Sequence, residues 1–389
     1  MNILLVHNSL NDSTSVSGVL KHYALVAKEW VEQGHKTDFL VATAGFPQVA
    51  DLCPTAGKVS SDRWFNASSY IEQTWRYFPA YGWRLLNAHL QRFERQYDVV
   101  YASNFLIFEM YPAWIIARRH RARLVVKAQH VLHAQPKRES LFDRLFLATE
   151  RLAAKIANRH ADLIMCLSDV VGRDYRALEL ELGLPVSNVV TVGCGLDFAD
   201  IEATPQASKE YDVVFLGRMH EQKGVFELPA VWSRVNRDCS DARLLVIGEG
   251  PHRPQTQKRF EEAGLSDQVT FVGGVPEKEK NRLLAASSIG LSLSYEEGWG
   301  LSVTEYLAAG LPVVAYDLPV FRSEFDGHLT LKSRGDQDAV AQTLVEWIRN
   351  PTTAEQLGER GREFVHRFDY RTVAREELDL MLQLFEGGE

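Results

Sequence analysis

The chain has 389 residues, of which 46% are hydrophobic and 24% charged, and its formal net charge is −8. A chain of this length is expected to form two or three domains, and its hydrophobic content excludes a wholly disordered protein. The acidic balance argues against a nucleic-acid-binding protein that works through overall positive charge, so no nucleic-acid partner is expected.

Short β-rich runs alternate with longer helical patterns along the whole chain. In the first half the predicted strands are Ile3–Val6, Lys36–Val41, Val99–Ala102, Arg123–Lys127, Leu163–Leu167 and Asn188–Val192. In the second half they are Asp212–Leu216, Arg243–Ile247, Val269–Val272, Gly290–Leu293 and Pro312–Ala315. Near-continuous apolar strands with helices between them indicate parallel sheets that are covered on both faces. The sequence therefore predicts an α/β protein with two doubly wound domains.

The boundary between the two domains is expected in the polar segment Phe198–Tyr211, which has a proline and no clear period. This linker predicts an N-terminal domain over 1–200 and a C-terminal domain over 201–370. A helical apolar pattern continues over Arg371–Phe385. The final residues, 371–389, are expected either to complete the second domain or to cross back onto the first.

Cysteine usage and the first residues indicate the compartment. Four separated cysteines without a CxxC pair fit a reducing compartment and argue against a zinc ribbon or a disulfide scaffold. The start of the chain, MNILLVHNSLND, turns polar after a short apolar run and is predicted to be a strand rather than a signal peptide. No run approaches 18 apolar residues. We expect a cytoplasmic protein.

Two features of the first half suggest a partner surface. Residues 118–159 hold 11 basic and 3 acidic residues, and Arg118, Arg119, Arg121 and Arg123 open this run. The run predicts either solvated helix faces or an anionic partner, such as a phosphorylated acceptor or the inner face of a membrane, which the protein would contact peripherally. Eight aromatic residues also lie within 63–83, as either an acceptor or interfacial surface or an aromatic helix packed on the sheet.

The strongest chemical signals converge on a nucleotide diphosphate, and the first is the turn Ser17-Gly18 at the start of a predicted helix. A small-residue turn lets the backbone approach a phosphate, which the free amides and the helix dipole favour. The alternative is an ordinary glycine at a helix start. The second signal is FLGRMHEQKG, where Arg218 and Lys223 follow a strand. Two cations at that strand end could neutralise a departing diphosphate. The alternative is a pair of exposed cations.

The third signal is YEEGWGLSVTEYLAAGLPVVA, in which Glu297 and Glu305 flank a glycine-rich turn. The turn, Gly298-Trp299-Gly300, precedes a helix predicted to begin near Ser302, so the amides of Gly300, Leu301 and Ser302 would face a phosphate. Glu305 could accept the hydroxyls of a ribose, and Glu297 those of a sugar. The alternatives are a capping box formed by Ser302 and Glu305 and a solvent-exposed loop acid at position 297.

These motifs resemble the retaining glycosyltransferases of family four (glycosyl transferases group one), and the similarity covers nearly the whole chain in order. The resemblance implies the GT-B fold, with two Rossmann-like domains facing a central cleft. It implies that Arg218 and Lys223 hold the diphosphate, Glu297 the donor sugar and Glu305 the ribose.

The resemblance also implies roles for residues that carry no strong signal of their own. Backbone near Gly273 and Val275 would meet the base, and Gly18 would approach the distal phosphate. A histidine after an N-domain strand would lie near the transferring sugar, for which His130 is the first choice and His133 the second. The sequence departs from the family pattern at Ser17, Cys194 and Ser302, where a glycine, an asparagine and a proline are common.

The expected reaction is transfer of a hexose from a nucleotide-sugar donor to an acceptor hydroxyl with retention of configuration. The donor is expected to be a UDP-sugar, with a GDP-sugar as the alternative. The acceptor is expected to be a glycan or lipid-linked molecule in polysaccharide or glycolipid biosynthesis. No DxD-like motif stands in the expected context, so neither a metal nor a cofactor is expected. The front-face mechanism implied by the resemblance passes the acceptor proton to the leaving phosphate oxygen.

Three other classes of protein compete with this interpretation. A nucleotide-sugar epimerase or hydrolase on the same fold would need no acceptor. A non-catalytic partner subunit is disfavoured because Arg218, Lys223, Glu297 and Glu305 are all present. A dinucleotide oxidoreductase could use Asp38 to bind a ribose, but neither half of the chain has GxGxxG.

Overall fold

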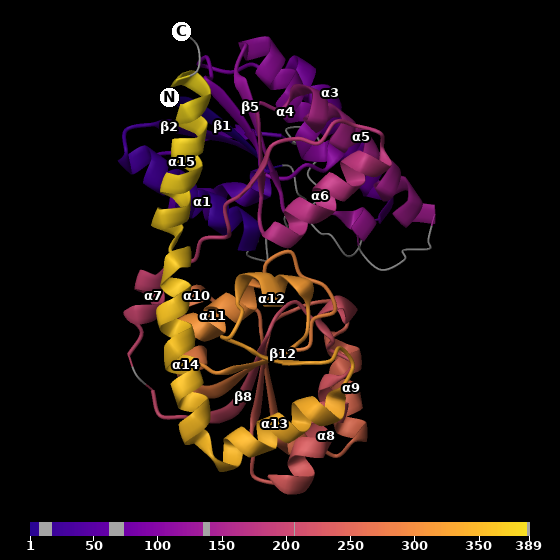
Figure 1. The fold of residues 1–389 in the computed structure, drawn as a ribbon, viewed down its shortest axis with the longest axis vertical. Coiled ribbons are helices and arrows are strands. Elements are labelled where there is room, and N and C mark those ends of the chain that lie inside the picture. Colours follow the sequence, from indigo (N-terminus) through magenta and orange to yellow (C-terminus); the bar gives the residue numbers. More distant parts are fainter. Residues whose placement is uncertain (8–17, 62–73, 135–140, 206, 387–389) are drawn as a thin grey trace. The chain divides into compact units, whose positions relative to one another are not determined.

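The computed structural model describes residues 1–7, 18–61, 74–134, 141–205 and 207–386. It divides into two compact units (Figure 1). The N-terminal unit runs to Gly195 and includes the C-terminal helix that begins at Tyr370, and the C-terminal unit is Leu196–Asp369. The first change of unit therefore lies five residues before the boundary expected from the sequence. The polar segment Phe198–Tyr211 is part of the C-terminal unit and starts with a short helix.

The N-terminal unit has a seven-stranded parallel sheet with the order β3-β2-β1-β4-β5-β6-β7. The strands are β1 (Asn2–His7), β2 (Lys36–Val41), β3 (Gly57–Ser60), β4 (Val99–Ala102), β5 (Arg123–Ala128), β6 (Leu163–Cys166) and β7 (Val189–Thr191). The helices are α1 (Gly18–Glu32), α2 (Phe46–Leu52), α3 (Thr74–Leu90), α4 (Ile107–His120), α5 (Leu141–His160), α6 (Asp169–Glu181) and α15 (Tyr370–Glu386), with 3-10 turns η1 (Thr43–Gly45) and η2 (Leu132–Ala134).

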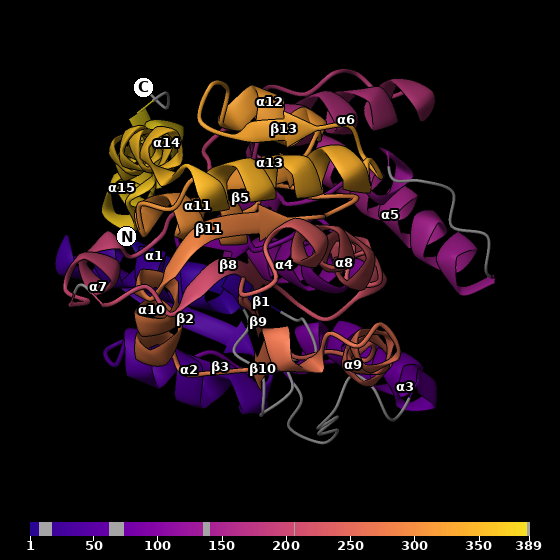
Figure 2. The ribbon, with the colours of Figure 1, turned by 90° about the horizontal axis from the view of Figure 1, so that it is seen from below.

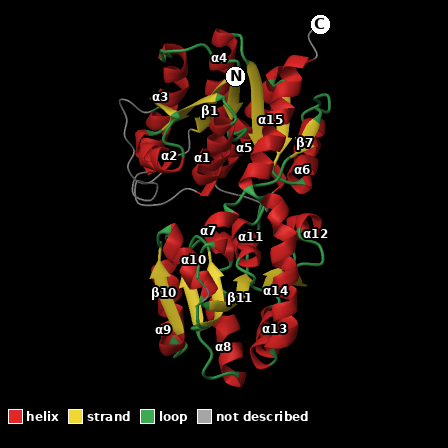
Figure 3. Cartoon of the chain, turned by 90° about the vertical axis from the view of Figure 1, so that its left-hand side faces the viewer, coloured by secondary structure: helices red, strands yellow, loops and turns green. Residues whose placement is uncertain are grey.

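The C-terminal unit has a six-stranded parallel sheet with the order β10-β9-β8-β11-β12-β13 (Figure 3). Its strands are β8 (Tyr211–Leu216), β9 (Leu244–Ile247), β10 (Val269–Gly273), β11 (Ser287–Ser292), β12 (Val313–Tyr316) and β13 (Thr330–Lys332). Its helices are α7 (Phe198–Glu202), α8 (Leu228–Asp238), α9 (Arg253–Glu262), α10 (Glu277–Ala285), α11 (Leu301–Ala308), α12 (Pro319–Glu324), α13 (Gln337–Arg349) and α14 (Pro351–Val365), with η3 (Glu221–Lys223), η4 (Ser266–Gln268) and η5 (His366–Phe368).

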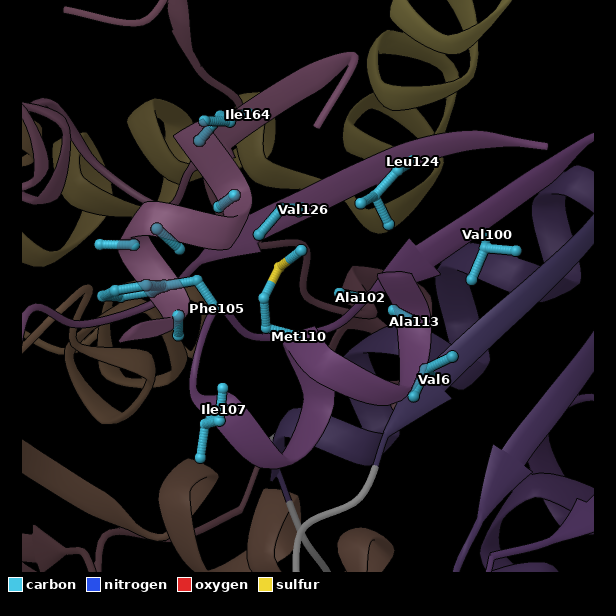
Figure 4. Packing of buried hydrophobic residues seen from close by; sticks show 14 of the residues in the cluster. Val6, Val100, Ala102, Phe105, Ile107, Met110, Ala113, Leu124, Val126 and Ile164 are labelled. Atoms are coloured by element: carbon cyan, nitrogen blue, oxygen red, sulfur yellow. The ribbon is translucent and has the colours of Figure 1, made fainter. Parts of the chain in front are cut away.

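Both faces of each sheet are buried, which explains the near-continuous apolar strands. In β1, Leu4 and Val6 belong to the core under α4, α5 and α6, whereas Ile3 and Leu5 belong to the core under α1 and α15. This alternation is the two-residue period of a strand. Figure 4 shows Met110 of α4 in the first of these cores. In the C-terminal unit, α8 and α13 pack together over one face (Figure 2).

Helix α15 is fixed to the N-terminal unit by a buried ion pair. The ammonium of Lys127 on β5 donates a hydrogen bond to the carboxylate of Glu377 on α15, and both side chains are 0% exposed. The Tyr101 hydroxyl also donates to Glu377 at 3.0 Å, and the Lys127 ammonium donates to the Gly193 carbonyl at 3.1 Å. The Trp30 indole donates to the Ala374 carbonyl at 2.8 Å. These contacts hold the C-terminal helix against the first sheet.

The point at which the chain leaves the N-terminal unit requires a glycine. A Cβ at Gly195 would lie 2.6 Å from Cα of Tyr370, so a side chain has no room there. The Gly195 N–H donates to Nδ1 of His22 at 3.2 Å. Burial, and then the neighbouring Lys127 ammonium, lowers the pKa of His22 well below its usual value, so this imidazole stays neutral and can accept the bond.

Candidate functional site

Charged side chains gather at the carboxyl ends of β8 and β11, which are neighbours in the C-terminal sheet. Nζ of Lys223 lies 2.5 Å from Oε1 of Glu297, with the lysine side chain 24% exposed and the glutamate 9%. The Ser294 hydroxyl also donates to this carboxylate at 2.8 Å. In parallel sheets, ligands bind at this edge. The structure thus brings together two residues that lie 74 positions apart.

The turn after β8 places the cations. Arg218 is exposed directly beyond the strand and donates to the side-chain oxygen of Gln222 at 3.3 Å. Gly224 ends η3 with φ 70°, and a Cβ there would lie 2.2 Å from the Leu293 carbonyl oxygen. This close approach of the η3 turn to the end of β11 carries Lys223 to Glu297 and explains why glycine follows the lysine.

Helix α11 begins at this edge without a side-chain cap. Gly300 is the N-cap residue, with φ 109°, and a Cβ there would lie 2.6 Å from the Phe321 ring. Ser302 is the second residue of the helix, so the capping box expected as the alternative role for Glu305 is wrong. Because no side chain caps α11, its first-turn N–H groups are left to bind water or an anion.

Glu305 is paired with a lysine that the sequence analysis missed. The Lys280 ammonium donates to the carboxylates of both Glu305 and Glu277, and Lys280 is only 8% exposed. Burial lowers the pKa of Lys280, but the two carboxylates more than offset it, so the pKa is raised and the lysine is charged. In the sequence this residue sits in a charged run, EKEKNR, that resembles a solvated helix face.

Two other predicted donor residues of the C-terminal unit, Gly298 and Trp299, are both buried. Trp299 is 2% exposed, donates its indole N–H to Thr304 at 3.0 Å and packs edge-on against Phe368, so its side chain belongs to the core. The Trp299 side chain is therefore held in the core and Gly298 has none, and the donor contacts expected of these two residues stay a prediction.

The predicted base-contacting backbone lies at the end of β10. Gly273 has φ 75°, and its carbonyl accepts the Gly248 N–H at 2.8 Å. A Cβ on Gly273 would lie 2.4 Å from Oε1 of Glu249. Val275 follows and is half-buried. Gly273 is the last residue of β10, and Val275 lies in the loop before α10, the helix that carries Lys280.

In the N-terminal unit, the two candidate histidines have different surroundings. His130 lies two residues beyond β5 and is exposed. His133 lies in η2, where Nδ1 is 2.7 Å from the carboxylate of the buried Glu150, which also accepts the His133 N–H at 3.0 Å. His133 is thus engaged in holding η2 to α5. The role of His130 beside a sugar stays a prediction, as do the ligand roles of the other residues.

Two further expectations fall at the limits of the described chain. Gly18 is the first residue of α1, and the turn before it lies outside the described residues, as do Trp64, Phe65 and Tyr70 of the aromatic cluster. Of that cluster, Tyr81 stacks on Phe108 with ring centroids 3.8 Å apart, which is a packing contact. Asp38 is buried and accepts a hydrogen bond from the Tyr97 hydroxyl at 2.6 Å, so it serves the core and not a ribose.

Among the residues that the structure describes, no three His, Cys, Asp or Glu side chains come together in a way that could hold a metal ion. None of the described helices is both long enough and apolar enough to cross a membrane.

The fold and the site together define a class: two parallel-sheet Rossmann-like units, the second with cations, carboxylates and a helix N-terminus at one sheet edge. Family models agree. Residues 17–195 match the glycosyl transferase 4-like domain, and residues 197–364 match glycosyl transferases group 1. The chain belongs to the family-four type of glycosyltransferases with the GT-B fold.

Relatives of known activity match parts of the chain. Phosphatidyl-myo-inositol mannosyltransferase of Mycobacterium leprae is 31% identical over 196 residues, which cover 48% of this chain and 52% of the relative. The 2-deoxystreptamine glucosyltransferase of Streptomyces kanamyceticus is 33% identical over 154 residues, or 39% of this chain and 40% of the relative. The chain thus spans about half the length, or less, of these curated relatives.

Solved structures match over nearly the full length and show the fold. HepE of Anabaena, crystallised with UDP and glucose, aligns with a TM-score of 0.74 at 17% identity and covers 98% of this chain and 100% of its own. Sucrose-phosphate synthase of Thermosynechococcus elongatus aligns with a TM-score of 0.76 at 19% identity over 100% of both chains.

Proposed function

We propose that the protein is a retaining glycosyltransferase that moves a sugar from a nucleotide-sugar donor to an acceptor hydroxyl. The observation that carries the proposal is the contact between Lys223 and Glu297 beside the uncapped start of α11. It puts a cation, a carboxylate and free helix amides at one sheet edge. These are the groups that a diphosphate and a sugar require.

Each group has a separate task in this proposal. Arg218 and Lys223, with the first-turn amides of α11, bind the diphosphate and stabilise the charge that develops as it leaves. Glu297 accepts hydroxyls of the donor sugar, and Glu305 accepts those of the ribose. Backbone at Gly273 and Val275 contacts the base.

The proposed reaction balances without a covalent enzyme intermediate. The bond between the anomeric carbon and the diphosphate oxygen breaks, and the acceptor oxygen bonds to the same face of that carbon. The acceptor proton passes to the leaving phosphate oxygen. Because Arg218, Lys223 and the α11 amides supply positive charge, we propose that the reaction does not depend on a metal ion.

The comparisons support classes of donor and acceptor. The HepE structure contains UDP, which supports UDP as the carrier, and GDP is the alternative. The mycobacterial relative is named for a phosphatidylinositol acceptor, which supports a lipid-linked or glycan acceptor and a role in glycolipid or glycan biosynthesis. We propose that the protein acts in the cytoplasm.

Product analysis tests the function. The full chain is incubated with UDP-, GDP- and ADP-sugars, first alone and then with lipid and glycan extracts, and the products are followed by phosphorus and proton NMR. Acceptor-dependent release of nucleotide, with an α-linked product from an α-donor, is expected. Conversion of the donor without an acceptor would instead support an epimerase or hydrolase, and a β-linked product would exclude retention.

The second part of the proposal is that the protein contacts a membrane surface. The proposed contact is the outer face of helix α5. Arg144, Lys155 and Arg159 lie along this exposed face, and Leu145 and Leu152 beside them are 46% and 51% exposed. Arg151 is exposed as well but is paired with Glu181. A helix that displays cations next to apolar side chains suits an anionic lipid surface. We therefore propose that α5 rests on the inner face of the membrane.

Two of the arginines that open the basic run make contacts within the N-terminal unit. Arg119 donates to the carbonyls of Ala88 and Gln91 at 2.8 and 2.9 Å, so it caps the end of α3. Arg118 lies over the Trp114 ring at 5.5 Å. We therefore place the proposed surface on α5 and not on these two arginines.

Reversing two of the α5 charges tests this surface. The Arg144→Glu/Lys155→Glu variant is expected to bind vesicles of 30% phosphatidylserine more than about tenfold more weakly, at about 1 kcal/mol for each cation near the surface. The matched control, Arg237→Glu/Lys258→Glu, reverses two exposed cations of the C-terminal unit. It should bind like wild type in a flotation assay. Equal binding of both variants and wild type would overturn the proposal.

A further inference from the structure

One ammonium joins the two helices that flank the proposed nucleotide site. Lys280 lies on α10, which begins at Glu277 directly after the residues assigned to the base. Glu305 lies on α11, 25 positions further along the chain. The Lys280 ammonium donates to the carboxylates of both Glu277 and Glu305.

Burial sets this ion pair apart from the ordinary charge pairs of the same helix. Arg282 and Glu279, which flank Lys280 on α10, also form a pair, but their side chains are 48% and 42% exposed. In the Lys280 group the exposures are 11% for the lysine side chain, 15% for Glu305 and 30% for Glu277. An exposed pair contributes little to geometry, whereas a desolvated pair holds its partners in fixed positions.

The pairing leaves half of the Glu305 carboxylate for a ligand. Lys280 binds Oε1, and Oε2 accepts no hydrogen bond from any residue that the structure describes. A ribose has two neighbouring hydroxyls, and a carboxylate whose orientation is fixed can accept both of them.

We propose that Lys280 is a positioning residue that makes the site selective for ribonucleotides over 2′-deoxyribonucleotides. This inference rests on the proposed function, in which Glu305 binds the ribose. With Lys280 in place, the carboxylate is held where the 2′-hydroxyl arrives. Without it, the Glu305 carboxylate is no longer held in this orientation and loses its preference for that hydroxyl.

Calorimetry with free nucleotides provides the test. UDP, GDP and ADP are titrated into the full chain together with their 2′-deoxy counterparts, and the tightest pair is followed through the variants. Wild type is expected to bind the ribonucleotide more than about tenfold tighter, since a hydrogen bond to a charged group is worth about 1.5–3 kcal/mol. In Lys280→Met the ratio should fall to within about threefold, mainly through weaker binding of the ribonucleotide.

Further variants separate positioning from stability and charge. Lys280→Arg keeps a cation and should retain most of the preference, and Glu279→Gln on the exposed side of α10 should retain all of it. The Lys280→Met/Glu277→Gln variant has the same net charge at this cluster as wild type, −1, and leaves no second carboxylate to repel Glu305. It should fold, as judged by its melting temperature, and still lack the preference.

The results distinguish a failure of this inference from a failure of the proposed function on which it rests. If Glu305→Gln abolishes the ribose preference while Lys280→Met and Lys280→Met/Glu277→Gln retain it, the role of Lys280 is wrong and the donor site stands. If Glu305→Gln retains the preference as well, the ribose assignment itself fails.

Discussion

Replacing Lys223 by alanine is expected to lower kcat for sugar transfer about 10²- to 10³-fold, the range found when one charge-stabilising donor is removed from an active site. The lysine lies 2.5 Å from Glu297 and is three-quarters buried. Its loss removes a cation from the proposed diphosphate site and leaves the Glu297 carboxylate unneutralised beside it. Since negative charge grows on the leaving group in the transition state, kcat should fall more than the donor KM rises.

Steady-state kinetics with the donor and acceptor found by product analysis checks this expectation. Lys258→Ala is the matched control, because that side chain is 73% exposed on α9 and its nearest carboxylate, on Glu262, is 3.7 Å away. Glu297→Gln keeps the shape of the partner and should also reduce turnover. Wild-type turnover in Lys223→Ala would remove the lysine from the proposed role.

Replacing Lys127 by methionine is expected to lower the free energy of unfolding of the N-terminal unit by about 3–5 kcal/mol. Lys127 and Glu377 are both 0% exposed, so the variant leaves a buried carboxylate without its cation. Glu377 lies on α15, and the helix should separate from the sheet before the rest of the unit unfolds. Hydrogen exchange in the peptides of α15 and β5, followed across a urea series, measures both effects.

A second variant tests whether the unpaired charge is the cause. Lys127→Met/Glu377→Leu removes both charges and should recover most of the lost stability, because an apolar pair can replace a buried ion pair. The Tyr101 hydroxyl loses its acceptor in that variant, so the recovery should be incomplete. Equal stability of Lys127→Met and wild type would show that the pair contributes nothing.

The fold could largely be predicted from the sequence because both sheets are parallel and helices cover their faces. All eleven predicted strands are present, with ends shifted by at most a few residues. The two that were missed, β3 and β13, are short edge strands whose residues are only partly buried or exposed. Without an apolar run, an edge strand of this kind has no pattern to distinguish it from a loop.

The sequence predicted the candidate site residues that lie together in one motif. It did not predict those that distant elements bring together. The pattern around Lys223 and Glu297 could be found because each lies next to glycines at a strand end. The capping box was a wrong expectation, because local spacing does not reveal that Gly300 already starts the helix. Lys280 was missed for the same reason: only the packing of α10 against its neighbours buries it beside Glu305.

The two crossings between the units have a consequence for how such proteins diversify. The ends of the C-terminal unit meet, since the Leu196 N–H donates to the Phe368 carbonyl at 2.9 Å. On the N-terminal side of the junction Gly195 packs against Tyr370, since a Cβ on the glycine would lie 2.6 Å from Cα of the tyrosine. A gene exchange that replaced residues 196–369 would therefore need two splice points and no new spacer. The unit that carries the proposed donor site could then be inherited as a cassette, separately from the N-terminal unit.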